Sequence, residues 1–219
     1  MEIKIENITK KFTRGRREFT VLDNVSATIP DNKFTVITGD SGVGKSTLLN
    51  ILSGLMRPTS GKVLYEDKEI TGLNDRDLSS LRIKDLGIVN QTSDLISYLT
   101  LEENLKLSRE IAGREGEDET DNVLRRLGLE DLKSSYPEEM SGGEIKRAAI
   151  ARAILISPQV LIMDEPTANL DRKNVRNVLS LLKEQQDKGK TIVISSHEEE
   201  ALEYCDLNID LEKYTKNEA

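Results

Sequence analysis

Residues 39–46 read Gly-Asp-Ser-Gly-Val-Gly-Lys-Ser, which fits the phosphate-binding pattern G-x-x-x-x-G-K-[ST]. The run Phe34–Ile37 before this loop is typical of a buried strand, and Thr47–Leu52 after it is typical of a helix. A strand, the loop and a helix in this order are the context that the motif requires. The order predicts an α/β fold that binds a nucleoside triphosphate where the helix begins. A glycine-rich turn without a ligand is the weaker interpretation, because both flanks are present.

Each residue type in this loop has a physical reason. Glycines let the chain wrap closely around a phosphate with its N–H groups pointing inward, and the helix start adds partial positive charge. Lys45 is expected to reach the β- and γ-phosphates, and the Ser46 hydroxyl is expected to bind Mg²⁺. The residues predicted to bind ATP here are Gly39, Asp40, Ser41, Gly42, Val43, Gly44, Lys45, Ser46 and Thr47.

Charge and hydropathy limit the partners of the chain. Its formal net charge is −8 over 219 residues, which disfavours nucleic acid as a partner because binding the phosphate backbone needs a basic surface. One cysteine excludes an internal disulfide and fits a reducing compartment. No apolar run approaches the roughly 20 residues of a membrane span, and no apolar signal segment follows Met1. We therefore expect a cytoplasmic protein that reaches a membrane only through a partner.

Apolar periodicity predicts two kinds of β structure. Ile3, Ile5 and Ile8 alternate with polar residues, and Thr20–Ile29 does the same beyond a turn at residues 14–17, so the chain opens with antiparallel strands. Another short strand region is expected at residues 61–70. Continuous apolar runs, which indicate a parallel sheet with helices on its faces, follow at Leu86–Val89, Val160–Met163, Thr191–Ile194 and Leu207–Leu211.

The strand pattern stops between Thr92 and Ser157. Helical periodicity replaces it, with predicted helices at Leu101–Ile111, Asp121–Leu127 and Gly143–Ile156 and a charged surface loop at residues 113–119. We interpret residues 92–157 as a helical subdomain inserted into one domain. Residues 1–91 and 158–219 would then form the ATP-binding core, including the antiparallel region.

Two adjacent carboxylates end the apolar run Val160–Met163. In phosphate-loop proteins, an acid from the strand beside the phosphate loop belongs to the Mg²⁺ shell, and Asp164 is assigned that role. Glu165 would lean toward the γ-phosphate and act as the general base for the attacking water. A strand end that merely carries two exposed acids is the alternative.

A second possible anion site lies at Ser141-Gly142-Gly143-Glu144. Ser141 occupies the position of a helix N-cap, and Glu144 follows three residues later as in a capping box. A Ser-Gly-Gly helix start can bind a phosphate. Because the phosphate loop already serves the chain's own nucleotide, this start needs another phosphate or the same phosphate approached from another subunit. A local cap without a ligand is the alternative.

These motifs occur in one order that covers nearly the whole chain, and by that order the sequence resembles the ATPase subunit of an ABC transporter. The resemblance implies a P-loop NTPase fold with an N-terminal antiparallel β subdomain and an inserted α-helical subdomain. It implies that Gln91 touches Mg²⁺ and the attacking water, and that His197 contacts the γ-phosphate. Ser141–Glu144 match the signature motif of the family, although Met140 and Glu144 depart from its usual leucine and glutamine.

Two further residues have a role by resemblance and a simpler alternative. Phe12 matches the aromatic residue that stacks on adenine, but it also fits a core position at a strand end. Asp171, in the turn Asn169-Leu170-Asp171, matches a loop that crosses the dimer interface, and it also fits a helix cap. Residues 58–61 and 164–171 are similar to those of the macrolide-export and lipoprotein-release branch.

The resemblance also implies the assembly. Two copies are expected to form a head-to-tail homodimer around two ATP molecules and to drive conformational change in transmembrane permease subunits at the inner face of the cell membrane. An apolar cluster follows Gln91 and consists of Leu95, Ile96, Tyr98 and Leu99. Some of these residues are expected to pack inside the helical subdomain, and the others to line a groove for a helix of such a permease. One alternative is an ABC-type ATPase that regulates a membrane-bound cell-envelope system without moving cargo. The other is an ATPase head of DNA maintenance, which the acidic charge and the absence of long coiled coils disfavour.

Overall fold

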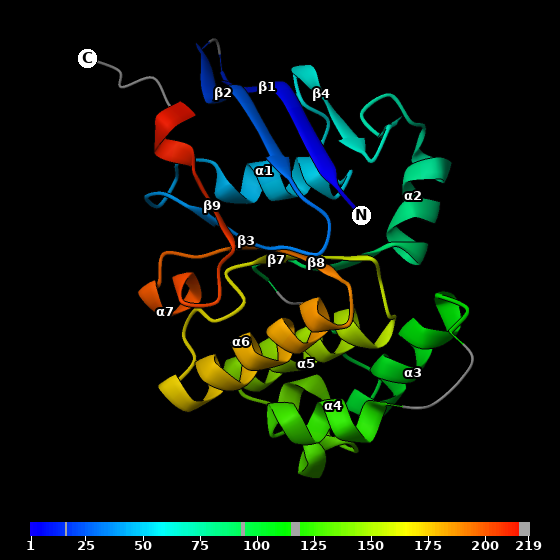
Figure 1. Cartoon of the computed structure of the whole chain (residues 1–219). Coiled ribbons are helices and arrows are strands. Elements are labelled where there is room, and N and C mark those ends of the chain that lie inside the picture. The colour runs from blue at the N-terminus through cyan, green and yellow to red at the C-terminus, as the bar shows by residue number, and fades with distance from the viewer. Residues whose placement is uncertain (16, 93–94, 115–118, 215–219) are drawn as a thin grey trace.

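The computed structural model describes residues 1–15, 17–92, 95–114 and 119–214, and it stacks the chain in layers (Figure 1). An antiparallel sheet forms one side, α1 (Lys45–Leu52) lies beneath it, and a parallel sheet follows. The longest helices, α5 (Gly142–Leu155) and α6 (Arg172–Asp187), cover the other face of the parallel sheet. This layering confirms the predicted α/β fold with an N-terminal antiparallel part.

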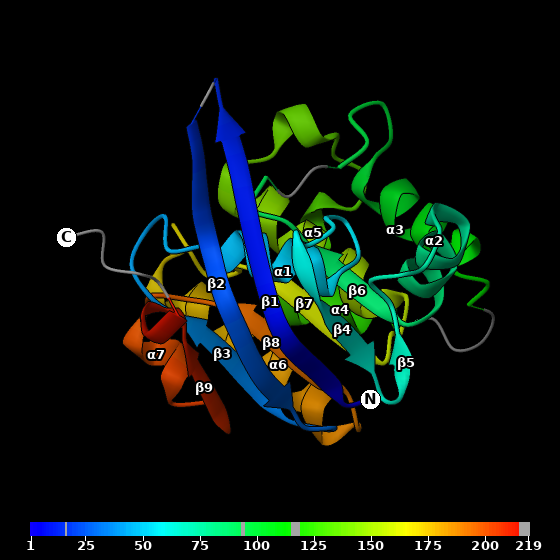
Figure 2. The same ribbon diagram turned by 90° about the horizontal axis from the view of Figure 1, so that it is seen from above.

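The antiparallel sheet has the strand order β2-β1-β4-β5. Its strands are β1 (Ile3–Arg14), β2 (Arg17–Ile29), β4 (Ser60–Tyr65) and β5 (Lys68–Glu69). The first two form the long hairpin that Figure 2 shows projecting over the molecule, with Arg14 opposite Arg17. The predicted opening hairpin is confirmed, although Arg16 in its turn lies outside the described residues.

The parallel sheet has the strand order β6-β7-β8-β3-β9. Its strands are β6 (Leu86–Val89), β7 (Val160–Asp164), β8 (Thr191–Ser195), β3 (Phe34–Thr38) and β9 (Leu207–Asp210). Every neighbouring pair runs parallel, so all carboxyl ends lie at one edge. One expectation is wrong: β7 is not beside β3, the strand of the phosphate loop, because β8 lies between them.

Burial on both faces explains why these strands read as continuous apolar runs. Along β7, Val160 and Ile162 face the core cluster on the α1 side, whereas Leu161 and Met163 face the cluster on the α5 side. All four side chains are at most 1% exposed. The alternation of faces follows from the period of two in a strand.

The helical segment predicted between Thr92 and Ser157 is confirmed for the residues that the structure describes. It contains α3 (Leu101–Ile111), α4 (Thr120–Leu127) and α5, with short 3-10 helices at Glu130–Leu132 and Pro137–Glu139. Residues 115–118 of the expected surface loop lie outside the described part. Because side chains of these helices and of the parallel sheet share one hydrophobic cluster, the exact subdomain boundaries stay a prediction.

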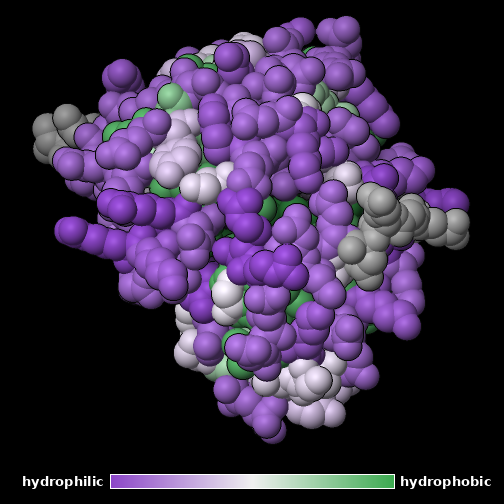
Figure 3. Space-filling view, turned by 60° about the horizontal axis from the view of Figure 1, so that its bottom comes forward, coloured by the Kyte–Doolittle hydropathy of each residue, from purple (hydrophilic) through white to green (hydrophobic). Residues whose placement is uncertain are grey.

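Sequence patterns missed several helices. The structure adds α2 (Asp75–Lys84), α7 (Glu199–Leu202) and a 3-10 helix at Leu211–Tyr214, whose first residue was expected to end the last strand. For α6, only a possible N-cap at Asp171 was anticipated. α6 is mostly polar, and only a stripe that includes Val175, Val178 and Leu182 is buried. The face of the molecule on the side of α4 and α6 is accordingly mostly hydrophilic, with small separate hydrophobic patches (Figure 3).

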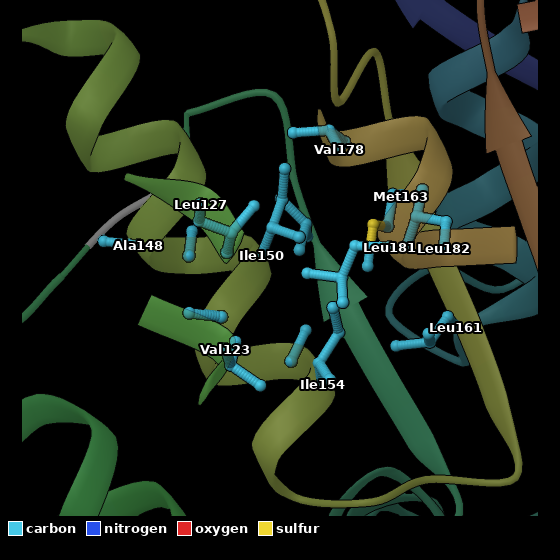
Figure 4. Close-up of a cluster of buried hydrophobic side chains, with 14 of the residues drawn as sticks. Val123, Leu127, Ala148, Ile150, Ile154, Leu161, Met163, Val178, Leu181 and Leu182 are labelled. Atoms are coloured by element: carbon cyan, nitrogen blue, oxygen red, sulfur yellow. The ribbon is translucent and has the colours of Figure 1, made fainter. Parts of the chain in front are cut away.

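Ile150 lies at the centre of the cluster that joins the helices to the sheet (Figure 4). Its side chain is fully buried among residues of α4, α5, α6 and β7, which include Leu127, Val178 and Met163. We therefore expect Ile150→Ala to lower the free energy of unfolding by about 2–5 kcal/mol, because the neighbours fill such a cavity only in part. Urea denaturation followed by circular dichroism measures this change.

Ile111 provides the matched control, since its side chain is 59% exposed at the end of α3. Ile111→Ala should change the same free energy by no more than about 0.5 kcal/mol. Equal losses in the two variants would contradict the central position of Ile150.

Candidate nucleotide site

The glycine-rich loop connects β3 to α1 in a conformation that requires its glycines. Gly39, Gly42 and Gly44 have φ angles of 137°, 85° and 111°, a region that favours glycine. At Gly44, an added Cβ would lie 2.8 Å from Leu22 Cδ2 and 2.9 Å from Val21 Cγ1. Gly44 therefore lets the loop pass directly beneath β2.

Lys45 is folded over this loop. Its Nζ donates to the carbonyls of Gly39 at 2.6 Å and Asp40 at 3.0 Å, and the residue is only 7% exposed. The Asp40 N–H in turn donates to Glu212 Oε1 at 3.1 Å, which fixes the start of the loop. A cation and the free N–H groups at the start of α1 are thus held together, as an anion site requires.

An open pocket of about 400 Å³ brings nine of the nineteen predicted site residues together. Its lining consists of Phe12, Phe19, Val21, Ser41, Gly42, Gly44, Lys45, Ser46, Thr47, Gln91 and Glu165. Gly39, Asp40 and Val43 belong to the same loop but are not among these lining residues. The pocket joins the hairpin, the phosphate loop and the end of the parallel sheet, as a site for a base, phosphates and attacking water would.

Phe12 is half-exposed on the pocket side of β1, so it is not the core residue that the alternative described. It stacks on Phe19 with ring centroids 6.0 Å apart and an interplanar angle of 26°. Lys10 Nζ lies 5.2 Å from the Phe12 centroid. The sequence reasoning missed Phe19, although the predicted turn at residues 14–17 places it opposite Phe12.

Asp164 ends β7 and is 8% exposed. Ser195, its register partner on β8, donates from Oγ to Asp164 Oδ1 at 2.6 Å. The same Oγ accepts the backbone N–H of Glu165 at 2.9 Å. Ser195 therefore orients both acids, and the sequence alone gave no sign of this because the contact depends on strand register.

Glu165 has a φ angle of 48°, which is uncommon for a residue with a side chain. Its Oε1 lies 3.5 Å from Nδ1 of His197, which follows β8. Lys146 Nζ donates to the backbone carbonyl of Glu165 at 3.1 Å. The structure thus brings Glu165, His197 and Asp164 to one edge of the sheet, next to the phosphate loop.

Ser141 and Gly142 lie at the exposed start of α5 and do not line this pocket. The predicted capping box is confirmed: Ser141 accepts the Glu144 N–H, while the N–H and the hydroxyl of Ser141 donate to Glu144 Oε2 at 2.7 and 2.6 Å. These hydrogen bonds hold the pKa of the Glu144 carboxyl below its ordinary value.

Asp171 is the N-cap of α6, as one of its two interpretations predicted. Its Oδ1 accepts the N–H of Asn174 at 2.9 Å and its Oδ2 accepts Asn174 Nδ2 at 2.6 Å, and these bonds lower the pKa of the Asp171 carboxyl. The cap leaves the preceding turn with Asn169, at a φ of 63°, on the surface.

Comparisons with known proteins agree with this geometry. The family model of the ABC transporter matches residues 22–168. HrtA of Staphylococcus haemolyticus, an ATP-binding protein whose name links it with hemin import, is 37% identical over 216 residues, which are 97% of this chain and of HrtA. The ABC transporter ATP-binding protein YtrE of Bacillus subtilis is 35% identical, covering 90% of this chain and 89% of YtrE.

Solved structures give the same result. The ATP-binding cassette MJ0796, described as a dimer in a post-hydrolysis state bound to ADP and Pi, superimposes with a TM-score of 0.88 at 32% identity. That match covers 95% of this chain and 93% of the other. A second dimeric structure of MJ0796 superimposes with a TM-score of 0.89. The chain therefore belongs to the ABC transporter family and is one of its ATP-binding ATPase subunits.

Proposed function

We propose that two copies of this ATPase close head-to-tail around two ATP molecules and transmit the closure to a transmembrane permease. The observation that carries the proposal is the position of Ser141: a capped, exposed helix start outside the chain's own nucleotide pocket. In a two-fold dimer, the same start on one copy completes the pocket of the other. The dimeric MJ0796 cassettes support this assembly.

Within one copy, the pocket divides the work on ATP among three elements. N–H groups of the phosphate loop and the Lys45 ammonium would bind the β- and γ-phosphates. Phe12, which stacks on Phe19 and lines the pocket, would contact the adenine ring. The partner copy would add Ser141 and the N–H groups of Gly142 and Gly143 to the γ-phosphate.

The donor set fits Mg²⁺. The Ser46 hydroxyl, the Asp164 carboxylate and the Gln91 amide offer the oxygen ligands that this ion prefers. No group of three or more His, Cys, Asp or Glu side chains gathers into a metal cage within the described part of the chain. A site with these few oxygen ligands from the protein suits an ion that is held partly by substrate phosphates and water. When bound, the ion would neutralise charge on the β- and γ-phosphate oxygens.

Hydrolysis would follow from the position of Glu165. Its carboxylate would take a proton from the attacking water, whose oxygen bonds to the γ-phosphorus while the bond to the ADP oxygen breaks. His197, 3.5 Å from Glu165, would contact the γ-phosphate and keep the carboxylate aimed at the water. Gln91 lines the same pocket and would orient that water.

ATP and ADP would favour different states because only ATP carries the interfacial γ-phosphate. Moving an equilibrium from 1:99 to 99:1 takes roughly 5.5 kcal/mol of differential binding. Two sites with several hydrogen bonds to a charged phosphate, each worth roughly 1.5–3 kcal/mol, reach that value. Loss of the γ-phosphate would then open the dimer.

Glu165→Gln tests the catalytic assignment. The amide cannot accept the proton of water, so we expect turnover to fall by about 10²–10⁴-fold while ATP binding persists. An ATP-bound dimer should accumulate, which size-exclusion chromatography with light scattering detects. Normal hydrolysis by this variant would remove Glu165 from its role.

Two variants complete that experiment. Ser141→Ala should prevent the ATP-bound dimer when combined with Glu165→Gln, although each monomer still binds nucleotide. Lys45→Ala should weaken nucleotide binding itself, because it removes the buried cation of the phosphate loop. If Ser141→Ala leaves dimer formation and turnover unchanged, the head-to-tail assembly is wrong.

The permease would dock on the loop before α3. No described helix is long and apolar enough to cross a membrane. Leu95 packs against the core, which fits interior packing, whereas Tyr98 is 78% exposed. Asn104, 1% exposed, accepts the Ile96 N–H at 2.8 Å and donates to the Leu99 carbonyl at 3.0 Å. We propose that this braced loop presents Tyr98 to an amphipathic helix of the permease.

The branch resemblance supports an exporter or a force-transmitting system, with this subunit peripheral at the inner face of the membrane. Gln91 lines the nucleotide pocket and lies only a few residues before the Tyr98 loop. One short segment of chain therefore connects the pocket with the proposed docking loop. A contact at Tyr98 would therefore pass ATP-driven motion to the permease.

Tyr98→Ala should uncouple transport. In vesicles that contain the copurifying permease, with hemin as the first cargo because of HrtA, we expect cargo movement to fall at least about tenfold, the loss expected from removing a central aromatic contact. Basal ATPase activity of the isolated subunit should stay within about twofold, because the residue touches no nucleotide.

Tyr136→Ala is the control, since Tyr136 is another exposed tyrosine of the helical segment. It should leave transport unchanged. A Tyr98→Ala subunit that loses its folded circular dichroism spectrum would support interior packing instead of docking.

A further inference from the structure

Lys146 ties the start of α5 to the segment that carries the catalytic base. Its Nζ donates to the carbonyls of Glu165 and Ala168, both at 3.1 Å. Those carbonyls lie at either end of the turn between β7 and the stretch that leads to Asp171. One side chain therefore holds a whole turn of backbone against α5.

The surroundings of Lys146 show that this contact is built into the fold. The residue is half-buried, and the carboxylates facing it belong to Glu165, Glu198 and Asp164. Glu198 is itself fixed, because the hydroxyl of the buried Thr167 donates to its Oε2 at 2.5 Å. Charge-assisted hydrogen bonds in such a partly desolvated place are stronger than those at an open surface.

Glu165 is held from both sides as a result. The hydroxyl of Ser195 on β8 accepts its N–H at 2.9 Å, and Lys146 on α5 binds its carbonyl. This grip maintains the φ angle of 48°, a conformation that costs free energy unless its surroundings impose it. The direction of the Glu165 carboxylate therefore depends on where α5 lies relative to the sheet.

Lys146 is also close to the other nucleotide contact. It follows Gly143 by three residues, a rise of about 4.5 Å along a helix. The start of α5 touches the same catalytic segment a second time, since a Cβ at Gly143 would lie 3.2 Å from Leu170 Cδ2. A displacement at Ser141–Gly143 would thus reach Glu165 through Lys146 without passing through a flexible loop.

We propose that Lys146 is a positioning residue that couples the two ATP sites. Binding of the partner's ATP at the start of α5 sets the position of Lys146, which sets the Glu165 backbone and thereby the general base of the chain's own site. This inference rests on the proposed head-to-tail dimer. It makes hydrolysis in each pocket depend on occupancy of the other.

Lys146→Met tests the proposal, because methionine keeps much of the apolar stem but has no donor. In the full-length protein, we expect kcat to fall about tenfold, the lower end for losing a charged hydrogen bond. KM for ATP should change less than about twofold. The Hill coefficient for ATP hydrolysis should fall from near two toward one, since two coupled sites set its upper limit at about two.

Controls separate this role from general stability. Lys106→Met removes an exposed lysine of α3 and should leave kcat and the Hill coefficient unchanged. Lys146→Arg restores a cationic donor and should recover cooperativity, and Lys146→Leu, which also has no donor, serves if the methionine variant does not fold. A Lys146→Met or Lys146→Leu variant that folds, and keeps both wild-type kcat and wild-type cooperativity, overturns the proposal. Loss of kcat with cooperativity intact also overturns the coupling.

Failure of the dimer would look different. If Ser141→Ala keeps wild-type turnover and Glu165→Gln forms no ATP-bound dimer, the proposed function itself is wrong. If both variants behave as expected and Lys146→Met does not, only the coupling through Lys146 is wrong.

Discussion

Strand register in the parallel sheet is the constraint on which this site depends. Ile37 on β3, Ser195 on β8 and Asp164 on β7 lie side by side in consecutive strands. Within two residues of these positions, the phosphate loop follows Ile37, His197 follows Ser195, and Glu165 follows Asp164. Three stretches of chain, of which the first lies more than a hundred residues before the other two, thus place their polar groups at one edge, because parallel strands end together. A one-residue slip in β8 would remove the Ser195 contact to both acids.

Much of this fold could be predicted from the sequence for a simple reason. Strands buried on both faces read as unbroken apolar runs, and β6 and β7 were found within one residue of their ends. The start of α5 was equally clear, since the capping box of Ser141 and Glu144 was predicted from the sequence. The polar helix α2 was missed, and of α6 only a possible cap at Asp171 was anticipated, because little of the surface of either helix is apolar.

The sequence pointed to Glu165 and His197 as candidate site residues, but not to the residues that hold Glu165 in place. Glu165 follows from an apolar strand that ends in two carboxylates, and His197 follows from the family resemblance, whereas Ser195 and Lys146 bind the Glu165 backbone through contacts between distant elements. The order of strands was also beyond reach: an acid was expected from the strand beside the phosphate loop, and the structure inserts β8 between them. Sequence patterns describe what one segment prefers, and sheet order depends on how segments meet.

Asn104 gives the region before α3 a mechanical property. The buried Asn104 amide forms hydrogen bonds to Ile96 and to Leu99, at the two ends of a short loop. These bonds hold the loop rigidly against the first turn of α3. A rigid loop transmits a displacement with little loss, whereas a flexible loop would absorb the displacement by bending. Under the proposed function, work done by ATP hydrolysis would therefore leave this molecule as a displacement of the Tyr98 ring.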